Sequence, residues 1–130
     1  MTEPLIRDYF DGLIDADRLM TERQADKQSP YYMQIDAIDN GTYQLTTEHL
    51  TKLCADVLDG NLTINYLDSI AFILIGSDFF YWDTEDGKII SEVLFEWNNP
   101  DINYPLTLGN VQEWSNYLNG QERKMNLSGS

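Results

Sequence analysis

Apolar residues recur at helical spacing from the start of the chain. Between residues 5 and 14 they fall at i, i+1, i+4, i+5, i+8 and i+9, which is one face of an α-helix. These positions are Leu5, Ile6, Tyr9, Phe10, Leu13 and Ile14. Thr2 stands before them as a capping residue, with Glu3 and Pro4 in the first turn. The pattern predicts an amphipathic helix that buries this face.

A second helix is predicted after Thr46 or Thr47, either of which can cap it. Glu48 lies at its positive end, and Gly60 provides the stop. Its apolar positions repeat at i, i+3, i+4, i+7 and i+8: Leu50, Leu53, Cys54, Val57 and Leu58. This segment is the clearest helix in the sequence.

Thr63 opens a third predicted helix, which Gly76 ends. The same spacing returns at Leu67, Ile70, Ala71, Leu74 and Ile75. Phe72 and Ile73 make its second half apolar on all sides. That distribution predicts a buried central helix.

Residues 88–97 fit two patterns. As a strand, the segment would carry Ile89, Val93 and Trp97 on one face but would separate apolar from charged residues poorly. As a helix, it separates them and places Glu92 and Glu96 opposite the apolar residues. We therefore favour a helix that ends at the sequence Asn-Asn-Pro, residues 98–100.

A last helix is predicted from Thr107 as its cap to Gly120 as its stop. Its inward positions are Leu108, Val111, Trp114 and Leu118. The turn before it carries three apolar residues that we expect to pack under it: Ile102, Tyr104 and Leu106. The apolar and aromatic stretch 92–107 is then a joint between two core helices, not an active-site loop.

The remaining segments are less regular. Residues 21–30 are polar and indicate a loop or a frayed helix end, and residues 121–130 indicate a disordered tail or a remnant of cloning. Asn40-Gly41 is a two-residue turn signal, compatible with a short β-hairpin within residues 31–45. We predict a mainly α, single-domain helical bundle of about five helices that spans residues 1–120.

The charge distribution limits the class of partner. The chain has a net charge of −14, and residues 31–120 hold fourteen acidic and two basic residues. Such a surface repels nucleic acid and anionic membranes, so we expect neither to bind directly. It attracts and steers a basic protein, and in the competing interpretation the charge serves solubility alone.

No apolar run is long enough for a membrane helix, and no signal peptide is recognisable, so we expect a cytoplasmic protein. A single cysteine, Cys54, excludes an internal disulfide and lies on an apolar helical stripe. The single histidine, His49, is five residues away and forms no local dyad with it. His49 is expected at the surface or in a helix cap.

Signals for catalysis and for metal binding are weak. The sequence has no nucleophile elbow, no P-loop and no dinucleotide-binding motif. A calcium loop beginning at Asp83 would need a glutamate where Leu94 stands. We therefore expect no enzyme, no cofactor and no metal site, although a carboxylate-dependent enzyme remains a third reading behind two binding functions.

From residue 45 to residue 118 the chain resembles a family of small acidic immunity proteins from bacterial contact-dependent growth inhibition and related polymorphic toxin systems. The resemblance lies in an ordered set of stretches: LTTEHLTKLCADVLDG, LTINYLDSIAF, SDFFYW and VLFEWNNPDINYPLT. It implies a protein that binds a cognate toxin C-terminal domain, often a basic nuclease, and blocks its active site or an essential surface. A single acidic domain favours a monomer, so we expect one copy of this chain in a heterodimeric complex.

We predict that the partner-binding surface consists of acids beside exposed aromatic residues, because aromatic anchors surrounded by charge suit an interface. These residues are Asp78, Tyr81, Trp82, Asp83, Glu85, Asp86, Glu92 and Glu96. In the competing interpretation Phe79, Phe80 and Trp82 are core residues and the acids merely solvate a turn. The alternative function is an acidic adaptor or nucleic-acid-mimicking regulator that sequesters another basic protein.

Overall fold

The computed structural model describes residues 2–21, 42–122 and 124–125. Within these ranges the chain is mainly helical, as predicted, with six α-helices and one pair of two-residue strands. The elements are α1 (Glu3–Phe10), α2 (Ala16–Thr21), β1 (Tyr43–Gln44), α5 (Thr47–Leu58), α6 (Tyr66–Gly76), β2 (Phe80–Tyr81), α7 (Gly87–Asn98) and α8 (Leu108–Leu118). No helix in these ranges is long and apolar enough to cross a membrane.

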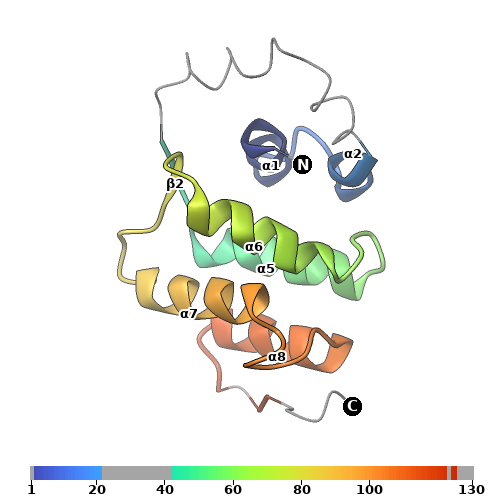
Figure 1. Ribbon diagram of the computed structural model, residues 1–130, viewed down its shortest axis with the longest axis vertical. Helices are drawn as coiled ribbons and strands as arrows, with labels where there is room; N and C mark the ends of the chain where they lie inside the picture. The colour runs from blue at the N-terminus through green and yellow to red at the C-terminus, as the bar shows by residue number, and fades with distance from the viewer. Residues whose placement is uncertain (1, 22–41, 123, 126–130) are drawn as a thin grey trace.

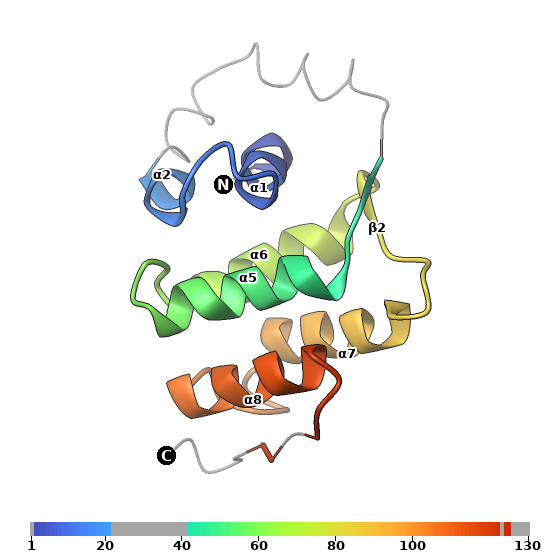
Figure 2. The ribbon, with the colours of Figure 1, turned by 180° about the vertical axis from the view of Figure 1, so that it is seen from behind.

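The helices lie in three tiers. The pair α5 and α6 occupies the middle, with α1 and α2 on one side and α7 and α8 on the other (Figures 1 and 2). Helix α5 packs against α8, and α6 packs against α7. One buried cluster connects the tiers, and Trp97 and Trp114 are its largest fully buried side chains.

The first helix forms where expected but is shorter than predicted. Thr2 caps it, and its Oγ1 accepts a hydrogen bond from the Leu5 backbone N–H. The helix ends at Phe10 because Gly12 adopts a positive φ of 79°, a conformation that glycine accommodates and that reverses the chain. Leu13 therefore points outward with 70 % of its surface exposed, and its predicted place on the buried face is wrong.

Helix α2 was not predicted as a helix of its own. It covers six residues and buries Ala16 and Leu19 against the core. Asp15 stabilises its start, since its Oδ1 accepts the Arg18 N–H at 2.9 Å. The sequence predicted one continuous helix up to residue 14 and not the short helix that follows it. Most of the predicted polar loop, residues 21–30, lies outside the described residues.

The helix predicted after Thr46 is confirmed as α5. Thr46 is its N-cap, and Gly60 follows its end with a φ of 83°. His49 is the third residue of the helix, and its Nδ1 accepts the Thr46 N–H at 3.0 Å, which closes a capping box. Four residues of the predicted apolar stripe are buried: Leu50, Leu53, Cys54 and Val57.

Helix α6 begins at Tyr66, after the turn that Thr63 opens, where the Tyr66 N–H donates to the Thr63 carbonyl at 3.0 Å. The helix is not buried on all sides. Phe72 is 67 % exposed and Ile75 is 44 % exposed, so the helix faces solvent at these two positions. The helix is central (Figure 1) and buries one face, as predicted, but its second half is not covered on all sides.

The two strands join distant parts of the chain. β1 and β2 pair in parallel, with Tyr43 opposite Phe80 and Gln44 opposite Tyr81. The Asn40-Gly41 turn of the predicted hairpin lies outside the described residues. Its described arm contains Tyr43 and Gln44, which pair in parallel with β2.

Residues 88–97 form a helix, as favoured, and α7 ends at Asn98 before the Asn-Pro turn. Thr107 caps α8 by accepting the Asn110 N–H at 3.2 Å. The turn between α7 and α8 is stabilised by the Asn110 side-chain amide, which donates to the Pro105 carbonyl at 3.0 Å. The stretch thus serves as a connection between core helices.

The joint differs from the prediction at two apolar residues. Tyr104 and Leu106 pack against the core as expected. Ile102 is 73 % exposed and Leu108 is 58 % exposed, so neither contributes to the core. Beyond α8, the Lys124 N–H donates to Glu113 at 2.8 Å, and Met125 packs against the core.

Candidate partner-binding surface

The predicted acidic surface centres on the connection between β2 and α7. Asp83, Glu85 and Asp86 are all exposed there, and Asp78 is exposed just before β2. The Gly87 N–H donates to the Thr84 carbonyl at 2.9 Å, which closes the turn before α7. We call residues 83–86 the acidic turn. It presents three carboxylates to solvent from one short, ordered connection.

Trp82 anchors the acidic turn to α7. Its side chain is half-buried, and its Nε1–H donates to the Ser91 hydroxyl at 2.7 Å. Gly87 lies under the tryptophan backbone, and a Cβ at that position would be 2.4 Å from the Trp82 carbonyl oxygen. The close approach requires a glycine, so the sequence fixes the path of the turn at both ends.

The aromatic residues beside the turn are partly core and partly surface. Phe80 is buried, while Phe79 and Trp82 are partly buried against the core and Tyr81 is half-buried. Phe80 meets Tyr43 and Phe10 with ring centroids 5.7 and 6.4 Å apart. The competing interpretation is therefore confirmed for Phe80, which is a core residue, and the role of the neighbouring acids in binding a partner stays a prediction.

The two predicted glutamates on α7 do not belong with the acidic turn. Glu96 is buried, and its Oε1 accepts the Trp114 Nε1–H at 2.9 Å. Glu92 is half-buried, and its Oε2 accepts the Tyr117 hydroxyl at 3.0 Å. Both carboxylates contact α8, so neither is exposed to solvent as the acids of the acidic turn are. The helical pattern of α7 alone could not show that α8 covers this side.

The residues best suited to nucleophilic or metal chemistry have structural environments. Burial raises the pKa of the Cys54 thiol to about 12, which leaves it protonated and unreactive at neutral pH. His49 caps α5, and its Nε2 lies 3.3 Å from the Tyr43 hydroxyl. In the described ranges, no group of three or more His, Cys, Asp or Glu side chains is arranged to hold a metal ion.

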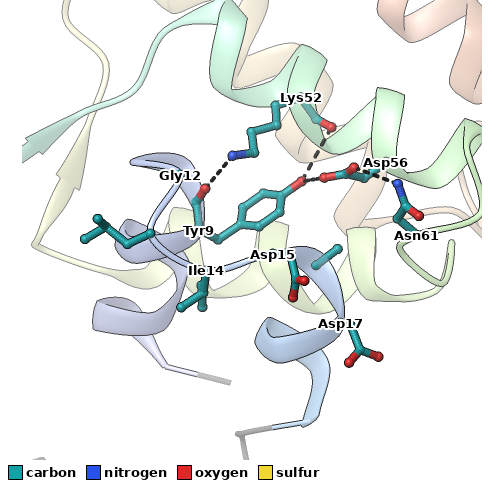
Figure 3. Close-up of a pocket in the computed structure, with 10 residues that line it drawn as sticks. Tyr9, Gly12, Ile14, Asp15, Asp17, Lys52, Asp56 and Asn61 are labelled. Atoms are coloured by element: carbon teal, nitrogen blue, oxygen red, sulfur yellow. Dashed lines mark hydrogen bonds between the residues drawn. The ribbon is translucent and has the colours of Figure 1, made fainter.

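A pocket of about 510 Å³ lies between the α1–α2 connection and α5, far from the acidic turn in sequence. It was not predicted. Figure 3 shows Tyr9 reaching from α1 toward α5, where its hydroxyl donates to Asp56. The Lys52 ammonium donates to the Tyr9 carbonyl at 2.6 Å and lies 4.5 Å from the centre of its ring. These contacts join the first tier of helices to the second.

The sequence contained a partial signal for this pocket. Gly12 interrupts the predicted first helix, and the acids Asp15 and Asp17 follow directly. One continuous helix over residues 5–14 would place Leu13 in the core, but Leu13 is exposed and lines the pocket, whereas Ile14 both lines the pocket and packs against the core. The hydrogen bond from the Tyr9 hydroxyl to Asp56 joins residues 47 positions apart, and hydrophobic periodicity cannot predict such a tertiary contact.

Comparison with known proteins gives no relative for this chain. No protein-family model, no curated protein and no solved structure matches it.

Proposed function

We propose that this chain is an immunity protein that binds a basic toxin domain in the bacterial cytoplasm and blocks its active site or an essential surface. The acidic turn carries the proposal. Asp83, Glu85 and Asp86 are exposed side by side on a turn that Trp82 and Gly87 hold in place. An ordered cluster of like charges does not have to be organised on binding, which lowers the entropic cost of association.

The charge of the whole chain supports a basic partner. A net charge of −14 produces a long-range field that accelerates association with a cationic protein. Tyr81, half-buried beside the acidic turn, offers aromatic contact area of the type that interface anchors use. Inhibition by blocking needs no catalytic group of this chain, which agrees with the structural roles of His49 and Cys54.

The first experiment is co-expression with the toxin candidate. The gene directly upstream in the source genome is cloned, and its C-terminal domain is expressed in cells with or without this protein. We expect the domain to be toxic alone, the cells to survive with this protein, and a complex to persist through size-exclusion chromatography. Killing that continues when this protein is abundant would contradict the proposal for that pair.

The same assay separates the alternative function. An acidic adaptor or nucleic-acid mimic would sequester a basic protein other than a toxin, and would leave the toxicity of the neighbouring gene product unchanged. Its complex with a different basic protein would then be recovered from lysate.

A further inference from the structure

The pocket between the α1–α2 connection and α5 has acidic walls. Asp15, Asp17 and Asp56 line it together with one lysine, Lys52, which gives its charged lining a formal charge of −2. The Lys52 ammonium is directed to Tyr9, and among the described residues no ion pair joins it to these aspartates. The pocket therefore retains a net attraction for a cation.

Two of the three carboxylates have capacity for a ligand. Asp56 is committed to the fold, since its oxygens accept the Tyr9 hydroxyl and, at 3.4 Å, the Asn61 amide. Asp15 uses Oδ1 to accept the Arg18 N–H, which leaves Oδ2 for another donor. Asp17 is exposed and accepts no hydrogen bond within the described part of the chain. In Figure 3 both lie on the same side of the Tyr9 ring.

The same pocket has an apolar wall. Leu13 and Ile14 line it, and Leu13 is 70 % exposed. Apolar side chains next to carboxylates match a ligand that carries a cationic head on an aliphatic stem, as arginine, lysine and polyamines do. A simple metal ion or an inorganic cation would gain nothing from Leu13.

We propose that this pocket binds an alkyl guanidinium or alkyl ammonium group, with its stem against Leu13 and Ile14 and its charge between Asp15 and Asp17. The group belongs either to a basic side chain of a protein partner or to a free polyamine. The pocket is built from α1, α2 and α5, so the inference does not rest on the acidic turn or on the proposed function.

The test is an NMR titration of the isolated full chain at low ionic strength. The probes are N-acetyl-arginine amide, its neutral counterpart N-acetyl-citrulline amide, and spermidine. One variant combines Asp15→Asn and Asp17→Asn, because asparagine at position 15 still caps α2. The control combines Asp101→Asn and Glu122→Gln, two exposed acids outside the pocket, and removes the same charge.

We expect saturable shifts at residues of the pocket with a cationic probe and none with citrulline. Neutralising Asp15 and Asp17 should weaken binding about tenfold or more, since the cationic group loses its hydrogen bonds to two charged partners. The control should bind as the natural chain does. The tighter of arginine amide and spermidine identifies the source of the group.

Three results would overturn the inference. The first is that neither cation binds. The second is that citrulline amide binds as well as arginine amide. The third is that the control variant loses as much affinity as the pocket variant, which would show that only general charge attraction is involved. A dispersed amide spectrum for each variant shows that loss of binding is not loss of fold. Because no toxin is used, these outcomes are independent of the co-expression result.

Discussion

At the scale of single residues, the side chains with the most reactive chemistry serve the fold. His49 illustrates this role, because its Nδ1 accepts the Thr46 N–H and so must be unprotonated. The proton of the neutral ring then lies on Nε2, directed toward the Tyr43 oxygen at 3.3 Å, while the Tyr43 hydroxyl donates to Asp11 at 2.6 Å. His49 thus links the start of α5 to β1 directly, and through Tyr43 it links both to Asp11 at the end of α1.

This arrangement predicts a pH dependence of stability. Burial lowers the pKa of His49 below its ordinary value of 6.5, and Lys52 lowers it further, against the opposing effects of Asp11 and Glu48. Below pH 6.5 the unfolded chain takes up the proton first, so stability falls as the pH drops from there through the folded pKa. The contribution is fully present above pH 6.5.

The measurement is the free energy of unfolding at several pH values for the natural chain and for His49→Gln. Glutamine at this position keeps a side-chain acceptor for a capping box but does not titrate. We expect the natural chain to lose more stability than the variant between neutral and mildly acidic pH. Parallel curves for the two proteins would show that His49 is not the responsible group.

Gly87 yields a second residue-scale prediction. Substitution by alanine places a Cβ 2.4 Å from the Trp82 carbonyl oxygen, so the acidic turn must shift. We expect Gly87→Ala to cost about 1–3 kcal/mol of stability, as overpacking of a closed site does. Gly109 is the matched control, because a Cβ there has no neighbour within 4 Å, and alanine should be neutral or stabilising by up to about 1 kcal/mol. Thermal unfolding of both variants distinguishes the two sites; equal midpoints would contradict the packing argument.

At the scale of elements, the sequence predicts helices well and their exposed faces less well. Capping residues and glycines predict α5 and α8 at Thr46, Gly60, Thr107 and Gly120, because these signals act within a few residues. The outward position of Phe72 on α6 depends on which helices pack beside it. Hydrophobic periodicity carries no information on such neighbours, so an all-apolar helix is read as buried.

The same limit explains the candidate surface. The acids of the acidic turn are exposed, as predicted, because a short polar turn between two elements has no partner to cover it. Glu96 lies one helical turn from Glu92, and the helical pattern places both opposite the apolar residues of α7. The covering residues, Trp114 and Tyr117, are 18 and 25 positions further along, so a local pattern could not reveal them.

The contact between α7 and α8 gives an element-scale prediction. Glu96→Ala would leave the buried Trp114 Nε1–H without its Glu96 acceptor, at a cost of about 1–3 kcal/mol. Glu96→Gln keeps an oxygen in that place and should cost less. Urea unfolding with tryptophan fluorescence measures both variants. An equal loss for alanine and glutamine would show that the hydrogen bond does not hold the two helices together.

At the scale of the molecule, three tiers of helices support two separate acidic features. The acidic turn lies between β2 and α7, and the pocket lies between α1, α2 and α5. Both are held by specific contacts, through Trp82 and Ser91 in one and Tyr9 and Asp56 in the other. Removing charge from these defined positions should therefore weaken binding more than lowering the net charge elsewhere on the chain.

Whether the acidic turn is the partner-binding surface is tested by the rate at which purified protein associates with the toxin domain, measured by stopped flow over a range of salt concentrations. The variant Asp83→Asn, Glu85→Gln, Asp86→Asn is compared with a control of equal charge, Asp59→Asn, Asp101→Asn, Glu122→Gln. We predict that the first variant associates about tenfold more slowly at low salt and loses most of its salt dependence, while the control changes little. Equal rates for the two variants would contradict the assignment of the acidic turn as the partner-binding surface.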